Sequence, residues 1–137
     1  MEENVRRTPV ALLAVGLAAT AASLVPAAQA SAADAGTSLV LSKVFSGPTP
    51  GEKDHSVTLQ CEPTGGSHPT PDAACASLIA VDGQFAKLPT VWAACPATYD
   101  PVTVSVSGTW HFKTVSFTQT YTNDCAAGVL SDYVFRF

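Results

Sequence analysis

The sequence predicts an α+β domain, in which an antiparallel sheet of five strands has a helix packed on it. Three observations lead to this class. Short stretches in which apolar and polar residues alternate recur along the chain, and this pattern is typical of strands with one buried face. One segment combines helix-capping residues with apolar residues at helical spacing. Four cysteines, an even number, indicate two disulfides in a small exported domain.

Residues 1–30 have the composition of a secretory signal peptide. Arg6 and Arg7 precede an apolar run, Val10–Val25, and Ala28-Gln29-Ala30 offers a small-x-small cleavage site. A membrane anchor is the alternative, but the run is shorter than the roughly 20 residues of a spanning helix. We therefore expect cleavage after Ala30, secretion, and no association with a membrane once the leader is removed.

Residues 31–137 then make one domain with a net negative charge. The whole chain has 11 acidic and 7 basic residues, a net charge of −4, and the leader removes two of each. Nucleic-acid binding needs clustered basic residues, so this function is excluded. Residues 31–37 (SAADAGT) are small and polar, and we expect a flexible tail there. The basic residues of the domain are scattered: Lys43, Lys53, Lys87, Lys113 and Arg136.

Five segments have the pattern of strands. The first is Ser38–Phe45, which is followed by a loop of turn residues, Ser46–Lys53. The second is His55–Cys61, in which apolar residues alternate with polar ones. The others are Val102–Ser107, Thr109–Thr122 and Tyr133–Phe137. Ser107-Gly108 is the expected hairpin turn between the third and the fourth.

The clearest helix begins at Pro71 and ends before Asp82-Gly83. Thr70 is a suitable N-cap, and Asp72 favours the positive end of the helix dipole. A second, weaker helix is expected over Ala126–Leu130, which is short and contains a glycine. The apolar positions of the first helix recur on one side, with a cysteine beside them: Ala74, Cys75, Leu78 and Val81.

No catalytic motif is present in the sequence, and an enzyme is not expected. There is no G-x-S-x-G, no H-E-x-x-H and no phosphate-binding glycine loop. Ser67 lies beside His68, but adjacency in the sequence does not make a catalytic pair, and a turn is the simpler interpretation. The other histidines, His55 and His111, lie in predicted strands. We therefore expect no cofactor.

The four cysteines, Cys61, Cys75, Cys95 and Cys125, favour disulfides over a zinc site. No C-x-x-C spacing occurs, and His68 lies seven residues from both Cys61 and Cys75, which matches no usual ligand spacing. We therefore expect no metal. The sequence alone leaves three pairings open. If sequence neighbours pair, each bridge would stabilise the fold by roughly 3–4 kcal/mol.

One short segment, Ala94–Val102 (ACPATYDPV), combines a cysteine, two prolines and small residues. Pro96 removes a backbone donor and fixes φ, so a central strand is not expected there. Pro101 favours an extended conformation at Asp100. An oxidised Cys95 would also join the segment to a distant part of the chain. The segment is therefore expected to be stiff, extended and exposed.

Several blocks of the sequence resemble the subtilisin inhibitor family of Streptomyces. The first is Cys61–Pro69 (CEPTGGSHP) followed by Ala74–Leu78 (ACASL), and the second is Cys95-Pro96 followed by Tyr99–Val102 (YDPV). The resemblance covers residues 38–137, nearly all of the mature chain. Three further blocks match in order and spacing: Val106–Trp110, Asn123–Cys125 and Val134–Phe137.

The resemblance implies the fold, the disulfide pairing and the partners. It implies a five-stranded antiparallel sheet with two helices packed on one side, and disulfides Cys61–Cys75 and Cys95–Cys125. It also implies a homodimer formed by sheet-to-sheet packing and secretion by a bacterium. The partner that it implies is a subtilisin-like serine protease.

The resemblance also assigns a role to the stiff segment. In the family, the residue two places after the third cysteine is the primary specificity residue, so the reactive bond is Ala97–Thr98 here. The residues on its two sides would contact the non-primed and primed parts of a protease cleft: Ala94, Cys95 and Pro96, then Tyr99, Asp100 and Pro101.

This chain departs from the family at the reactive bond, because relatives often carry Met or Lys where it has Ala97. Ala94 is small as well, so two non-primed pockets of a subtilisin would be underfilled. We expect weaker inhibition of subtilisin than by the best relatives. A trypsin-like enzyme would be inhibited poorly, since position 97 has no basic side chain.

Two alternative functions remain at this point. Some relatives are reported to inhibit an extracellular metalloprotease, and this chain would then do the same. The other alternative is a secreted, non-inhibitory structural protein that is cross-linked through Gln84, Gln119 or Lys43. Trp92, five residues before Ala97, would either contact a protease or pack under the loop, and packing is favoured because tryptophan is usually largely buried.

Overall fold

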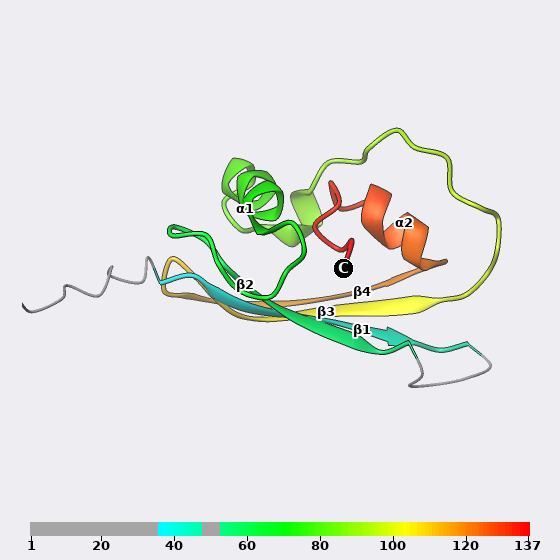
Figure 1. Cartoon of the computed structure of the whole chain (residues 1–137), viewed down its shortest axis with the longest axis horizontal. Coiled ribbons are helices and arrows are strands. Elements are labelled where there is room, and N and C mark those ends of the chain that lie inside the picture. Colours follow the sequence, from blue (N-terminus) through cyan, green and yellow to red (C-terminus); the bar gives the residue numbers. More distant parts are fainter. Residues whose placement is uncertain (1–35, 48–52) are drawn as a thin grey trace, which may run out of the picture.

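The computed structural model describes residues 36–47 and 53–137 (Figure 1). The predicted signal peptide, residues 1–30, and residues 31–35 of the predicted tail lie outside these described residues. The last two tail residues, Gly36 and Thr37, are buried against a hairpin turn, where the Gly36 carbonyl accepts from the Phe112 amide at 2.9 Å. Within the described ranges, no helix is long and apolar enough to cross a membrane.

Four antiparallel strands form the sheet in the described part of the chain, in the order β2-β1-β3-β4. Alternate side chains of the central strands are buried, as the sequence predicted. In β1, Leu39 and Leu41 are fully buried, and Leu41 lies opposite Val57 of β2 and Val106 of β3. The strands are β1 (Ser38–Phe45), β2 (His55–Gln60), β3 (Val102–Trp110) and β4 (Lys113–Tyr121).

Two α-helices and a single 3₁₀ turn cover the same face of this sheet (Figure 1). They are α1 (Pro71–Ala80), η1 (Phe85–Lys87) and α2 (Asp124–Val129). The hydrophobic core lies between this layer and the sheet, and Leu78 of α1 and Ala127 of α2 are fully buried in it. The α+β class and the placement of both helices on one side are therefore confirmed.

The fifth strand predicted at Tyr133–Phe137 is wrong, because this segment forms turns. Asp132 and Tyr133 have φ angles of 49° and 61°, which an extended strand does not allow. The amide of Tyr133 bonds to the Gly128 carbonyl at 2.9 Å. Val134 and Phe135 are both fully buried, although neighbours in a strand point to opposite faces. The segment instead fills the space between the helices and the sheet.

The hairpin turn between β3 and β4 also lies elsewhere than predicted. Its two residues are His111 and Phe112, with φ angles of 44° and 64°, whereas Gly108 lies inside β3. Positive φ at both central residues is the geometry that matches the twist of paired strands. Gly108 is needed for another reason, since a Cβ there would lie 2.1 Å from the Ser38 carbonyl oxygen of β1.

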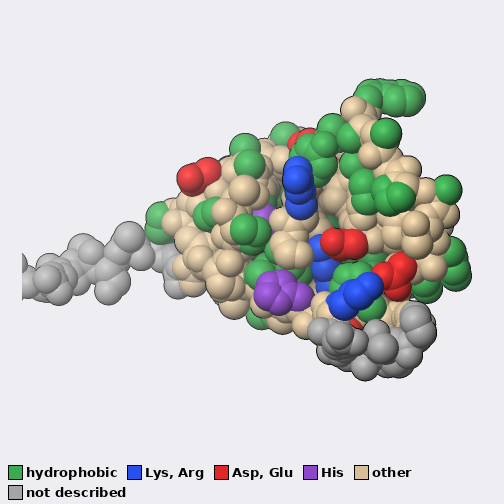
Figure 2. Space-filling view, turned by 45° about the vertical axis from the view of Figure 1, so that its right-hand side comes forward, with side chains coloured by type: hydrophobic (Ala, Val, Ile, Leu, Met, Phe, Trp, Pro, Cys, Tyr) green, Lys and Arg blue, Asp and Glu red, His purple; other side chains and the backbone are tan. Residues whose placement is uncertain are grey.

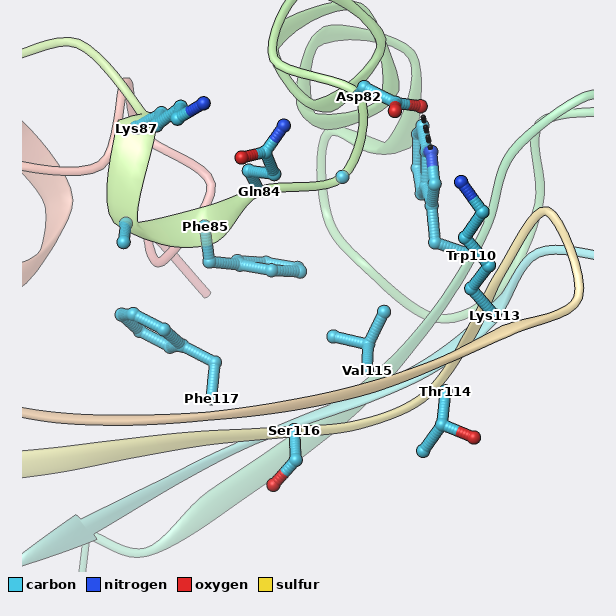
Figure 3. A pocket seen from close by; sticks show the side chains of 12 residues that line it. Asp82, Gln84, Phe85, Lys87, Trp110, Lys113, Thr114, Val115, Ser116 and Phe117 are labelled. Atoms are coloured by element: carbon cyan, nitrogen blue, oxygen red, sulfur yellow. Dashed lines mark hydrogen bonds between the residues drawn. The ribbon is translucent and has the colours of Figure 1, made fainter.

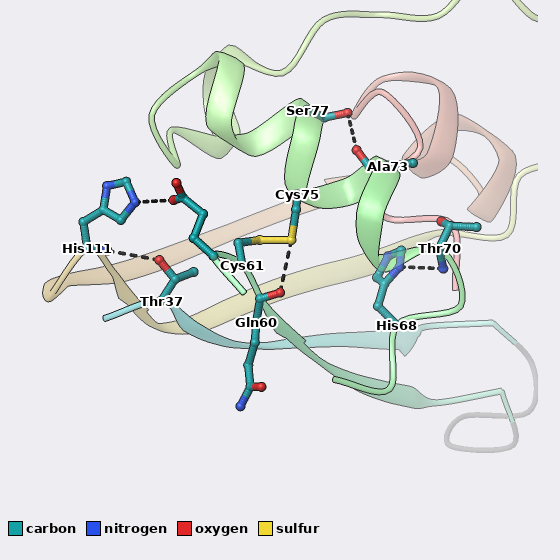
Figure 4. Close-up of a disulfide and its surroundings, with 10 residues drawn as sticks. Thr37, Gln60, Cys61, His68, Thr70, Ala73, Cys75, Ser77 and His111 are labelled. Carbon is teal, nitrogen blue, oxygen red and sulfur yellow. Dashed lines mark hydrogen bonds and ion pairs between the residues drawn. A yellow bond between two sulfur atoms is a disulfide. The ribbon is translucent and has the colours of Figure 1, made fainter. Parts of the chain in front are cut away.

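The disulfides join Cys61 to Cys75 and Cys95 to Cys125, which is the pairing that the resemblance implies. The first connects the end of β2 to α1 and is buried (Figure 4). Beside it, His68 is 3% exposed. Its Nδ1 accepts from the Thr70 amide at 3.1 Å, so its Nε2 carries the proton and donates to the Val134 carbonyl at 2.9 Å. His68 is therefore a structural anchor.

Candidate functional site

A long loop, residues 88–101, connects η1 to β3 and contains no helix or strand. It runs outward from the body of the molecule at the end opposite the β3–β4 turn (Figure 1). Most of its side chains are exposed, and those of Ala97 and Thr98 are among them. The whole predicted protease-contacting segment, Ala94–Pro101, lies on this loop. The structure therefore presents the segment as an accessible peptide.

Helix α2 holds the first half of the loop at two points. The Val91 amide donates to the Val129 carbonyl at 2.7 Å. Four residues further on, Cys95 forms its disulfide with Cys125 in the first turn of α2. Because both points are on one short helix, the backbone between them is constrained although its side chains are exposed.

Asn123 holds the centre of the loop with its carboxamide group. The Nδ2 atom donates to the Pro96 carbonyl at 3.1 Å and to the Thr98 carbonyl at 2.9 Å. The Oδ1 atom accepts from the Ala126 amide at 2.8 Å, so the same side chain caps α2. Asn123 itself is buried, with 8% of its surface exposed. The Ala97–Thr98 bond thus lies between two carbonyl groups that are fixed by one buried side chain.

The second half of the loop is bonded to the ends of the strands. The Asp100 amide donates to the Thr122 carbonyl at 3.0 Å, and the Pro101 carbonyl accepts from the Ser46 amide at 3.0 Å. The Asp100 carboxylate also forms an ion pair with Lys53 at 2.8 Å. The two ends and the middle of the loop are therefore all attached to the rest of the fold.

Most of the loop carries no charge, and Asp100 is its one charged residue. Residues 88–99 include no charged side chain, and the protruding upper right-hand part of Figure 2 has hydrophobic and uncharged atoms on its surface. A buried charge lies at the start of α2, where Lys43 of β1 is 2% exposed and its Nζ donates to Asp124 at 2.6 Å and to the Phe137 carbonyl at 2.9 Å. At the end of β4, burial raises the pKa of the Tyr121 phenol above its usual value.

Two residues differ from what the sequence predicted. Trp92 does not pack under the loop, because its side chain is 99% exposed. Lys43 is buried, so it is not accessible to a cross-linking enzyme, whereas Gln84 and Gln119 are exposed. The function of Asn123 was not foreseen, although the residue stands in one of the blocks that resemble the family and Asn is preferred at the N-cap of a helix.

A surface pocket lies away from the loop, between η1 and the edge strand β4 (Figure 3). It encloses about 390 Å³, and the rings of Phe85 and Phe117 stack beside it at 5.7 Å. The nearby Asp82 carboxylate accepts from the Trp110 indole at 3.1 Å, so both groups already have a structural role. No group of three potential metal ligands occurs among residues 36–47 and 53–137. The loop is therefore the candidate site.

The family model and the known proteins that this chain resembles all belong to one group. Residues 35–123 match the family model described as subtilisin inhibitor-like. The chain is 42% identical over 134 residues to the subtilisin inhibitor of Streptomyces violaceus, which covers 88% of this chain and 90% of that protein. It is 44% identical over 84 residues to subtilisin inhibitor-like protein 5 of Streptomyces fradiae, covering 60% of this chain and 78% of that protein.

A solved structure has a similar fold. It is the crystal structure of Streptomyces caespitosus sermetstatin in complex with Bacillus licheniformis subtilisin. The TM-score is 0.55 and the sequence identity is 28%, and the match covers 73% of this chain and 97% of that chain.

Proposed function

This chain belongs to the subtilisin inhibitor-like family, and on that premise we propose that it inhibits subtilisin-type serine proteases by binding in their active-site cleft like a substrate. The reactive bond is Ala97–Thr98. Ala94, Cys95 and Pro96 occupy the non-primed side of the cleft, and Tyr99, Asp100 and Pro101 continue on the primed side. The protein is an inhibitor and not an enzyme.

The observation that carries this proposal is the pair of hydrogen bonds from Asn123 to the carbonyls of Pro96 and Thr98. A peptide that is already held in an extended form loses little conformational entropy when it adds to a protease cleft as a strand. The same bonds keep the two sides of the reactive bond close together after cleavage. Resynthesis of the bond then competes with release of the cleaved ends, so the peptide blocks the enzyme.

Ala97 determines the range of proteases. Its methyl group leaves a large apolar specificity pocket partly empty, which costs about 1.5–3 kcal/mol relative to a Met-sized side chain. This difference corresponds to a roughly 10- to 150-fold weaker affinity. The uncharged side chain also offers nothing to the acidic pocket of a trypsin-like enzyme. Subtilisins and proteases that prefer small residues are therefore the expected targets.

The uncovered face of the sheet supports a homodimer formed by sheet-to-sheet packing. The outward side chains of the four strands are uncharged, and two of them, Val40 and Val44, are 42% and 50% exposed. No helix of the described residues covers this face (Figure 1). We include secretion in the proposal because of the composition of residues 1–30. N-terminal sequencing of the exported protein, expected to begin at Ser31, and sedimentation analysis test these two points.

The first experiment is the titration of subtilisin of known active-site concentration with the oxidised protein, followed by mass spectrometry of the complex. We expect stoichiometric inhibition with slow, partial cleavage between Ala97 and Thr98 alone. Ala97→Met should tighten inhibition by roughly 10- to 150-fold. Rapid and complete degradation, or no inhibition at excess protein, contradicts the proposed function.

A further inference from the structure

The two tryptophans of this chain have opposite environments. Trp110 is 3% exposed, and its indole donates to Asp82 at 3.1 Å. Trp92 is 99% exposed, so the fold gains nothing from burying the indole, which has the largest apolar surface of any side chain in the protein. Trp is also the residue type most enriched among those that dominate binding energy at protein interfaces. Trp92 therefore has the properties of a binding residue without a partner inside this chain.

The backbone around Trp92 is constrained at both sides. The preceding residue, Val91, bonds through its amide to the Val129 carbonyl at 2.7 Å. Three residues after Trp92, the Cys95–Cys125 disulfide fixes the chain again. A short segment between two fixed points loses little conformational freedom when a partner binds to it. The indole is thus presented from a largely pre-arranged position.

The distance from the reactive bond places Trp92 within reach of a bound protease. Trp92 lies five positions before Ala97, and an extended chain spans at most about 3.3–3.6 Å per residue, or roughly 17 Å in all. A standard interface buries about 800 Å² on each partner, which corresponds to a circle of roughly 16 Å radius. Trp92 therefore lies at the non-primed margin of the contact surface, beyond the pockets that receive Ala94 and Ala97.

We propose that Trp92 is a specificity-determining contact whose indole binds an apolar surface of the subtilisin-type protease beyond its non-primed pockets. The binding energy of this contact compensates for the affinity that is lost because Ala97 and Ala94 underfill their pockets. The role rests on the proposed function, since the protease is the partner that the neighbouring segment binds. The chemistry of the contact is apolar, because residues 88–99 have no charged side chain. Its contribution is therefore expected to be insensitive to salt.

The test compares Trp92→Ala with Phe112→Ala in titrations of subtilisin. Phe112 is the matched control, because it is 79% exposed and lies in the β3–β4 turn at the other end of the molecule. We expect the inhibition constant of Trp92→Ala to rise roughly 10- to 100-fold, mainly through faster dissociation. Its thermal midpoint and its cleavage position between Ala97 and Thr98 should not change. Phe112→Ala should inhibit as the wild type does.

The outcomes separate this role from the proposed function. If the wild type does not inhibit subtilisin, the proposed function fails. If the wild type inhibits with cleavage at Ala97–Thr98 and Trp92→Ala has the same inhibition constant, only the role of Trp92 is overturned. The same holds if Trp92→Ala and Phe112→Ala weaken inhibition equally, since a general effect of surface aromatics would then explain both.

A second measurement observes the indole directly. Protein labelled with 5-fluorotryptophan should give two ¹⁹F signals, and Trp92→Phe identifies the one from Trp92. Addition of subtilisin should shift the Trp92 signal and leave the Trp110 signal in place. A Trp92 signal that moves with protein concentration in the absence of protease would mean that a second copy of the chain binds the indole. That result overturns the proposal.

Discussion

Asn123 uses every polar atom of its carboxamide, and only glutamine, whose side chain is one carbon longer, has the same set. Two N–H donors reach the Pro96 and Thr98 carbonyls, while the oxygen accepts from the Ala126 amide. Aspartate offers acceptors only, so it keeps the helix cap and loses both bonds to the loop. Alanine loses all three bonds. Aspartate and alanine at position 123 therefore separate two effects, the contribution of the helix cap to stability and the contribution of the loop bonds to resistance against cleavage.

We expect Asn123→Asp and Asn123→Ala to be cleaved by subtilisin at least roughly tenfold faster than the wild type, because two hydrogen bonds that hold the reactive bond are lost. Only Asn123→Ala should also lose about 1 kcal/mol of stability from the missing cap. Mass spectrometry over time measures cleavage, and urea unfolding measures stability. Cleavage of Asn123→Asp at the wild-type rate would show that the loop does not depend on these bonds.

Lys43 is a buried ammonium on an otherwise apolar face of β1, and it ties this strand to α2. Its Nζ donates to Asp124 at 2.6 Å and lies 4.5 Å from the centre of the Phe137 ring. Desolvation of a charge opposes the gain from pairing, so a buried pair adds little net stability over an apolar replacement. Loss of one partner is different, because it leaves the other charge buried.

Asp124→Ala should therefore lower the free energy of unfolding by about 2–4 kcal/mol, somewhat less than for a fully buried pair, because the Asp124 side chain is 54% exposed. Lys43→Met, which keeps the length of the side chain, should change it by less than about 1 kcal/mol. The double variant should recover most of the loss. Urea unfolding of the three variants provides the comparison, and equal losses in all three would contradict this account of the pair.

At the scale of elements, the strand β3 depends on a glycine that has no turn function. Gly108 has a φ of 135°, and a Cβ there would meet the Ser38 carbonyl oxygen at 2.1 Å. Neither the backbone conformation nor the space suits a side chain. Gly128 in α2 is the contrast, since a Cβ there would have its nearest contact at 3.7 Å, an ordinary distance.

Gly108→Ala should consequently destabilise the protein by more than about 3 kcal/mol, through strain at positive φ and the displacement of β1 from β3. Gly128→Ala should raise stability by about 0.5–1 kcal/mol, because alanine favours a helix. Thermal unfolding of both variants tests the difference. A loss of similar size at the two positions would mean that the close approach of β1 and β3 is not what requires Gly108.

The elements also show what the sequence could predict. Alternation located β1, β2 and β3, and capping residues located α1, because these signals are local. The β3–β4 turn was misplaced, since positive φ at His111 and Phe112 is not encoded by glycine or asparagine there. The segment Tyr133–Phe137 alternates aromatics as a strand does, but the core, through stacking of Phe135 on Phe85 at 5.8 Å, determines its shape.

The candidate site also has a part that the sequence could predict and a part that it could not. The loop residues from Ala94 to Pro101 were predictable, because prolines, a cysteine and the resemblance to a family all mark that segment. The hydrogen bonds from Asn123 to the loop were not predictable, because tertiary packing brings Asn123 to residues that are distant in the sequence. The exposure of Trp92 contradicted a general tendency of tryptophan, and no neighbouring residue signals the exception.

At the scale of the whole molecule, the loop is an outward extension of one corner of a rigid two-layer fold. Helix α2 and the ends of β4 and β1 meet at this corner, and each holds part of the loop. The other disulfide, Cys61–Cys75, is buried between β2 and α1 and holds neither end of the loop. The two bridges therefore contribute to different properties.

Removal of each bridge separates stability from inhibition. The sequence separations are 30 for Cys95–Cys125 and 14 for Cys61–Cys75, and the chain-entropy model gives similar losses of roughly 3–4 kcal/mol. At a temperature at which both variants remain folded, Cys61→Ala/Cys75→Ala should still be cleaved slowly by subtilisin. Cys95→Ala/Cys125→Ala should be cleaved rapidly between Ala97 and Thr98.

The physical reason is that the ends of a cut loop separate only if the loop is free to relax. With Cys95 released, the segment between Val91 and Pro96 loses its covalent attachment to α2, so the cleaved ends leave the active site before the bond reforms. Circular dichroism at the assay temperature establishes that both variants are folded. If both are then degraded at the same rate, general destabilisation and not local attachment of the loop determines whether the protein resists cleavage.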